Sequence, residues 1–247
     1  MKKIAGRIWV IWSGLWFSLI FLVMYPLFRI WFSHPSLYRI LHFHRRIWGV
    51  LTCIPALMLP IVSKEKPLPR GRRIIYCANH SSYLDILTCG TFLPGFNFFM
   101  AKMELGKVPL FRMWFRTLDV PVLRESIRSS HKAFLMAGKK LESGVNMIIF
   151  PEGRIPKDRP KLHSFKDGAF RLAIEHGAVI VPVTLPDNLK RVDSDNWTAS
   201  PGIMRMHIHR PIDTAHLKPE QADELKKQVY LIIEKKLTEY GVYENHT

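Results

Sequence analysis

Two side chains five residues apart, His80 and Asp85, are the first pair in this sequence that could catalyse a reaction. They follow the apolar run 74–77, which predicts a strand, and Asp85 lies near the start of segment 83–93, which predicts a helix. The helix start can fold the carboxylate back toward the imidazole. A carboxylate on one ring nitrogen fixes the tautomer and leaves the other nitrogen free as a base. The alternative is a structural histidine that caps the helix.

Three cations, Lys102, Arg124 and Arg154, follow or end short apolar runs that predict strands. Ligands of α/β sheets bind at the carboxyl ends of strands, and ammonium and guanidinium groups bind phosphate. The three cations together therefore indicate a site for an anionic ligand. Each one alone is more often a solvated surface charge.

The segment Phe-Pro-Glu-Gly-Arg at 150–154 predicts a tight turn after the strand 145–150, because proline and glycine favour turns. The turn would present Glu152 and Arg154 at the rim of the sheet. One interpretation is a solvated salt pair. The other is an anion-binding turn in which Arg154 is the ligand.

Alternating strand and helix patterns from residue 71 onward predict an α/β layered domain with a mixed sheet. The segment 186–201 is polar and predicts a surface loop. The expected strands are 74–77, 97–101, 120–123, 145–150, 178–185 and 204–209, and the expected helices are 83–93, 109–116, 129–141, 165–176 and 217–240.

The N-terminal residues 1–70 predict a separate hydrophobic, basic, membrane-associating segment of two helices, followed by the catalytic domain at 71–247. Residues 8–28 carry no formal charge and are long enough to span a hydrocarbon core. The second uncharged stretch, 47–63, contains Pro55 and Pro60, so it could span only marginally or bend back into the interface. A buried core helix is the alternative for this second stretch.

Net positive charge is concentrated near the N-terminus: residues 1–84 hold 12 of the 36 Lys and Arg but only one of the 20 acids, Glu65, and so contribute 12 − 1 = +11 of the net +16. Five of the seven Trp lie in the first 50 residues, beside the apolar runs. This combination is typical of an anionic membrane surface. Zinc-finger, RRM and basic-region patterns are absent from the sequence, so a nucleic-acid partner is not expected.

The distribution of positive charge also predicts sidedness. The basic cluster at 70–73 places everything after it on the cytoplasmic side, at the inner (cytoplasmic) membrane. Three cysteines without a C-x-x-C spacing argue against a disulfide framework and a zinc site, and favour a reducing compartment.

Six ordered blocks between residues 79 and 183 resemble the lysophosphatidic acid acyltransferase family, the 1-acylglycerol-3-phosphate O-acyltransferases of the glycerolipid acyltransferase superfamily, in its bacterial form. The hydrophobic N-terminus is also similar to the membrane-docking helices of bacterial members. The blocks are Asn79-His80-x-Ser82-x-x-Asp85, Ala101-Lys102-x-Glu104-Leu105, a strand that closes on Arg124, Phe150-Pro151-Glu152-Gly153, Phe165-Lys166-x-Gly168-Ala169 and Val181-Pro182-Val183.

The resemblance implies a role for each matching residue. His80 would deprotonate the acceptor hydroxyl, and Asp85 would orient and charge-stabilise His80. The hydroxyl oxygen would attack an acyl thioester, either acyl-CoA or acyl carrier protein, with no metal, no cofactor and no acyl-enzyme. The acceptor would be held by Arg124 and Arg154, with Lys102 as an additional contact and with Glu152 and Gly153 shaping the turn.

Two positions differ from the usual family pattern. The third block normally reads Phe-Pro-Glu-Gly-Thr-Arg, whereas here Arg154 follows Gly153 directly, so Lys157 or Arg159 could take the role of the usual arginine. The second block normally begins with Gly, where this chain has Leu118. Two alternatives therefore stay open beside 1-acylglycerol 3-phosphate as acceptor: another lysophospholipid or lyso-aminolipid, and a non-catalytic membrane lipid-binding protein.

Overall fold

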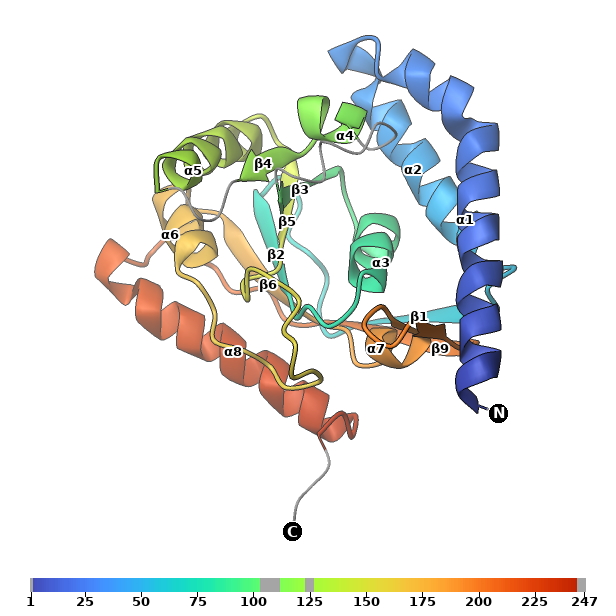
Figure 1. Ribbon diagram of the computed structural model, residues 1–247. Helices are drawn as coiled ribbons and strands as arrows, with labels where there is room; N and C mark the ends of the chain where they lie inside the picture. The colour runs from blue at the N-terminus through green and yellow to red at the C-terminus, as the bar shows by residue number, and fades with distance from the viewer. Residues whose placement is uncertain (1, 103–111, 123–126, 244–247) are drawn as a thin grey trace.

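The computed structural model describes residues 2–102, 112–122 and 127–243, and its centre is a mixed seven-stranded sheet with helices on both faces (Figure 1). The strand order is β1-β9-β6-β2-β5-β3-β4. Within this sheet the strand pairings are parallel except that of β6 with β9, which is antiparallel. The strands are β1 (Met58–Lys64), β2 (Ile74–Ala78), β3 (Asn97–Lys102), β4 (Val120–Val122), β5 (Asn146–Ile149), β6 (Val179–Thr184) and β9 (Gly202–Ile208). The expected α/β layers are thereby confirmed.

The central strand β2 is buried on both faces because alternate side chains enter two different cores. Ile75 and Cys77 pack toward α5 (Ile127–Glu142), α6 (Gly168–Glu175) and α8 (Ala222–Glu239). Ile74 and Tyr76 pack toward α3 (Leu84–Phe92) on the other face. A strand buried in this way is a rigid base for the turn that follows it.

The N-terminal helix α1 (Lys2–Trp31) packs beside α2 (Tyr38–Cys53), with the short helix η1 (Pro35–Leu37) between them. Phe21, Phe28 and Trp48 form an aromatic cluster that reaches Trp114 of α4 (Arg112–Thr117). Among the described residues α1 is the one helix long and apolar enough to cross a membrane. This helix supports the expected association with a membrane.

The second uncharged stretch, 47–63, differs from expectation. Its first part completes α2, and its second part forms β1, which pairs in parallel with β9 at the edge of the sheet. The stretch as a whole therefore does not form a second spanning helix. Pro55 follows the end of α2, and Pro60 lies in an edge strand, where a missing N–H is tolerated.

The polar segment 186–201 is also more ordered than the expected loop. It contains α7 (Asn188–Arg191) and a small antiparallel ribbon of β7 (Val192–Asp193) and β8 (Thr198–Ala199). Asp187 and Asn188 at its start are buried. Asp187 accepts hydrogen bonds from Arg205, and Asn188 Nδ2 donates to Asp85. After η3 (Pro219–Gln221), α8 is the last helix of the chain that the structure describes.

Candidate active site

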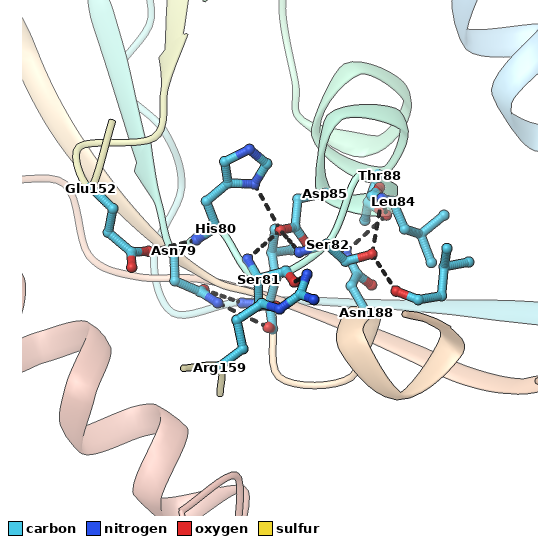
Figure 2. Close-up of polar contacts among 12 residues, drawn as sticks. Asn79, His80, Ser81, Ser82, Leu84, Asp85, Thr88, Glu152, Arg159 and Asn188 are labelled. Atoms are coloured by element: carbon cyan, nitrogen blue, oxygen red, sulfur yellow. Dashed lines mark hydrogen bonds and ion pairs between the residues drawn. The ribbon is translucent and has the colours of Figure 1, made fainter. Parts of the chain in front are cut away.

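The turn between β2 and α3 brings His80 and Asp85 together, as their spacing predicted (Figure 2). His80 Nδ1 donates to Asp85 Oδ2 at 3.0 Å. The His80 side chain is 8% exposed, and within the described residues no hydrogen bond to its Nε2 is recorded. The pair thus has one imidazole nitrogen engaged by a carboxylate and the other available to a ligand.

Asp85 is fully buried and surrounded by donors. Its Oδ2 also accepts the backbone N–H groups of Ser81 and Ser82, at 2.7 and 2.8 Å. These N–H groups precede α3, where the helix dipole favours a negative charge. The carboxylate therefore stabilises the turn and orients the histidine at the same time.

The second oxygen of Asp85 is held by a residue that the sequence analysis missed. Asn188 Nδ2 donates to Asp85 Oδ1 at 2.8 Å and to Thr88 Oγ1 at 3.1 Å. Asn188 lies 103 residues beyond Asp85, in the segment expected to be a surface loop. Its only signal in the sequence is its polar type, so a contact at this range could not be predicted.

Phe150 forms the floor under the histidine. The two rings stack with centroids 4.0 Å apart and an interplanar angle of 13°. Phe150 in turn stacks on Phe99 of β3, with centroids 6.3 Å apart. The imidazole is therefore positioned by a ring on one face and a carboxylate on its edge.

Glu152 is buried and does not form the solvated salt pair with Arg154 that one interpretation of the turn expected. Its Oε1 accepts the His80 backbone N–H at 2.7 Å, and its Oε2 accepts the His163 backbone N–H at 3.1 Å. Burial raises the pKa of the Glu152 carboxyl to about 7, although both N–H groups lower it. Gly153 closes the turn at φ +77°, which favours glycine. Glu152 thus connects the Phe-Pro-Glu-Gly turn to the histidine backbone.

Of the cations expected around the acceptor, Arg154 is exposed and Lys102 is the last residue of β3, while Arg124 lies outside the described residues. Lys166, which belongs to a matching block but was not expected to bind, lies against Gly153. Lys166 and Gly153 also line a pocket with Met100, Phe150 and Pro151. The Lys166 cation therefore lies beside Phe150, the ring on which His80 stacks.

Arg159, one of the two residues that could replace the usual arginine, is occupied. Its side chain is 5% exposed and donates to the Ser81 carbonyl at 3.0 Å. It also forms ion pairs with Asp193 and Asp195. Arg159 thus braces the histidine turn, and both of its terminal nitrogens are already engaged by protein groups.

A second, almost wholly apolar pocket lies between α1, α2 and α3. Phe99 lines it and links it through Phe150 to His80. Its other apolar walls include Phe17, Trp48, Ile86, Leu87 and Trp114. A hydrocarbon chain would be desolvated there, close to the proposed base.

The chain matches a family model described as Acyltransferase over residues 60–186. This stretch contains β2, the histidine turn and the Phe-Pro-Glu-Gly turn. The chain belongs to the acyltransferase family. Family membership therefore accounts for the order of the blocks, while the geometry above shows how they meet.

Individual relatives agree with the family assignment. The chain is 30% identical over 177 residues to the chloroplastic 1-acyl-sn-glycerol-3-phosphate acyltransferase LPAT1 of Arabidopsis thaliana, covering 69% of this chain and 48% of that one. It is 25% identical over 169 residues to the 1-acyl-sn-glycerol-3-phosphate acyltransferase of Haemophilus influenzae, covering 68% and 69%. The chain spans about half the length of the curated plant and algal relatives that it matches.

Among solved structures, the 1-acyl-sn-glycerophosphate (LPA) acyltransferase PlsC from Thermotoga maritima has the same architecture. The TM-score is 0.81 at 25% identity, over 98% of this chain and 99% of that one. The similarity extends to the N-terminal helices as well as the sheet, because it covers almost the whole of both chains.

Proposed function

We propose that this chain transfers a fatty acyl group from an acyl thioester to the free sn-2 hydroxyl of 1-acylglycerol 3-phosphate, which gives phosphatidic acid for phospholipid biosynthesis. The relatives' names support this acceptor. The observation that carries the proposal is the buried His80–Asp85 pair, with Nε2 of the histidine unoccupied by any described residue.

In the proposed reaction His80 Nε2 takes the proton of the acceptor hydroxyl as its oxygen attacks the thioester carbonyl. The C–S bond then breaks, and the departing thiolate receives this proton from the imidazolium, which restores the neutral histidine. Asp85 stabilises the transient positive charge, and its three other hydrogen bonds keep it from moving. Every proton is accounted for by the histidine, so the proposed step uses no metal and no cofactor beyond the thioester.

The substrates would approach from opposite sides of Phe150. The apolar pocket between α1, α2 and α3 suits an acyl chain. The acceptor phosphate would lie near Arg124, Arg154 and Lys102, with Lys166 beside Gly153 as a further cation. The thioester donor would be acyl-CoA or acyl carrier protein.

We propose further that the chain works at a lipid bilayer, at the cytoplasmic side of the inner membrane. The exposed apolar α1 supports docking, and the basic residues near the N-terminus support an anionic leaflet. In this arrangement both lipid substrates reach the site without leaving the membrane surface.

A second acceptor class has specific support in the arginine positions. Arg154 stands one place earlier than the usual family arginine, and Arg159 is held by Ser81, Asp193 and Asp195. This altered set of cations could accept a lipid whose headgroup is not a bare phosphomonoester, such as another lysophospholipid or a lyso-aminolipid.

The test uses purified protein in detergent with acyl-CoA and acyl carrier protein donors and a panel of acceptors. We expect transfer to 1-acylglycerol 3-phosphate, and a loss of at least about a thousandfold in kcat in His80→Ala. His216→Ala, which removes an exposed histidine, is the matched control. Equal activity in His80→Ala and wild type would remove His80 as the base. No transfer to any acceptor would favour the lipid-binding alternative.

A further inference from the structure

Strand register brings three metal-ligating side chains together at the outer edge of the sheet. β1 and β9 are parallel, and Ser63 pairs with His207. The same register continued by two residues places Glu65 opposite His209. Because side chains two residues apart in a strand share a face, Glu65, His207 and His209 all point to one side.

The three side chains meet around one point. Glu65 Oε1 lies 2.9 Å from His207 Nε2 and 3.0 Å from His209 Nδ1. One ligand atom from each residue lies within 4.8 Å of the other two. Ligands of a tetrahedral zinc ion are about 3.3–3.4 Å apart at the usual bond lengths. Small movements of Glu65 and of the two imidazole rings would therefore bring the three ligand atoms to the spacing that an ion needs.

Each ligand also has an outer partner that fixes its orientation. The remaining nitrogen of His207 meets Ser63 Oγ at 2.7 Å, and that of His209 meets Thr184 Oγ1 at 2.8 Å. Glu65 Oε2 accepts the Arg210 backbone N–H at 2.9 Å. Hydroxyl groups can donate or accept, so both histidines can present a bare nitrogen toward the centre of the cluster. Such outer contacts are typical of metal sites.

We propose that Glu65, His207 and His209 bind one Zn²⁺ ion, with a fourth position open to water. Two imidazole nitrogens and one carboxylate suit zinc rather than magnesium or calcium, which take oxygen ligands. The histidine side chains are 12% and 5% exposed, while that of Glu65 is 38% exposed, so an ion can enter past the glutamate. The site is separate from the proposed catalytic turn, because β6 lies between β9 and β2.

The role that fits this position is structural. The ion would fasten the end of β1, an edge strand that follows the membrane-side helices, to the end of β9. Lys236, a cation whose charge acts on His209, is paired with Glu239 at 2.7 Å, which reduces its repulsion of an ion. A metal bound only by the folded chain stabilises the folded chain.

The test uses full-length protein without an affinity tag, because a histidine tag binds zinc itself. The protein is stripped with a chelator, dialysed and titrated with Zn²⁺, while bound metal is measured by elemental analysis. Co²⁺ is titrated in parallel as a spectroscopic probe of tetrahedral geometry. We expect one Zn²⁺ per chain and a Tm rise of about 5–10 °C when free Zn²⁺ exceeds Kd a hundredfold.

His207→Gln and Glu65→Gln should each weaken Zn²⁺ binding at least about a hundredfold and remove the Tm rise. His216→Gln, at an exposed histidine outside the cluster, should bind as wild type does. Glu65→Gln changes an exposed side chain, so it keeps the test valid if His207→Gln does not fold. Zinc affinity in Glu65→Gln within threefold of wild type, or no Tm rise in wild type, would overturn the proposal. Acyl transfer is assayed separately and should survive removal of the ion.

Discussion

Asn188 helps to hold Asp85, and within the described residues no hydrogen bond joins Asn188 to the histidine itself. It donates to the oxygen of Asp85 that faces away from His80, and it is fully buried. Without it a buried carboxylate oxygen would lose its donor, and the carboxylate would be free to turn. The geometry of the proposed catalytic pair therefore depends on a side chain outside the His80–Asp85 motif.

We expect Asn188→Ala to lower kcat about tenfold with little change in KM, because the base is misaligned while the substrate contacts remain. Asn188→Asp should lower kcat further, since two carboxylates would then repel each other. Asn196→Ala, at an exposed asparagine that contacts Asp193, is the matched control and should keep kcat within twofold. Steady-state kinetics check this, and an unchanged kcat in Asn188→Ala would contradict it.

Glu152 should make stability depend on pH. Its folded pKa of about 7 lies above the ordinary 4.5, so the folded state holds the proton more tightly than the unfolded state. The stabilisation of the folded state by the protonated Glu152 carboxyl is fully present below pH 4.5 and is lost as pH rises through 7. Between pH 5.5 and 8.5 the free energy of unfolding should fall by about 2 kcal/mol more in wild type than in Glu152→Gln. Chemical denaturation at both pH values measures the difference, and parallel pH curves would refute it.

The range of each contact explains which site residues could be predicted from the sequence. His80 and Asp85 are joined across one local turn, so their spacing carried the information. Arg159 was a candidate phosphate ligand because its charge is visible in the sequence, whereas its partners Ser81 and Asp193 are far away along the chain. Long-range partners of this kind depend on the packed fold.

At the scale of elements, α2 and α3 pack closely at a single glycine. A Cβ added to Gly49 would overlap the side chain of Thr91, which is buried in the last turn of α3. Arg46, one turn earlier in α2, donates to the Thr91 carbonyl at 2.8 Å. The absence of a side chain at Gly49 thus sets the separation of the helices that line the apolar pocket.

We expect Gly49→Ala to lower the free energy of unfolding by about 2 kcal/mol, because the two helices must move apart. Gly14→Ala is the control, since a Cβ there meets nothing within 4 Å and alanine favours a helix. Thermal unfolding in detergent should show a Tm about 4–8 °C lower for Gly49→Ala alone. Equal Tm values for the two variants would show that α2 and α3 can accommodate a Cβ at Gly49 without loss of stability.

Strands differed in how far the sequence revealed them. β2, β5 and β6 are short, β-branched and apolar, because they are buried in the middle of the sheet, and they lie where the sequence predicted them. β1 was missed because it continues an uncharged run that also suits a membrane segment. β1 is a strand because it pairs with β9. The residues around 58 carry no pattern from which this distant partner could be predicted.

At the scale of the whole molecule, α1 exposes a continuous apolar surface. Its large side chains at helical spacing are roughly half exposed or more, and within the described residues no element covers them. They are Ile8, Ile11, Leu15, Leu19 and Leu22, with Val23 beside them. A soluble protein rarely leaves such a stripe open, so we expect the molecule to contact lipid through this stripe.

We expect the double variant Leu15→Glu and Leu22→Glu to lose at least about tenfold in binding to vesicles that contain anionic lipid, because charges are costly in the apolar layer. Gln228→Glu with Thr238→Glu adds the same charge on the exposed side of α8 and is the control. Co-sedimentation at a fixed ionic strength separates the two. An equal loss of vesicle binding in both double variants would show that binding depends on net charge and not on the apolar stripe.

The pairing of β1 with β9 also constrains how the molecule is made. The two strands are 144 residues apart, with Met58 opposite Gly202, so the sheet edge stays open until most of the chain has been synthesised. During that time α1 is already available to the bilayer, and β1 waits beside it as an unpaired apolar strand. We therefore expect α1 to be able to attach to lipid before β9 is available to complete the sheet.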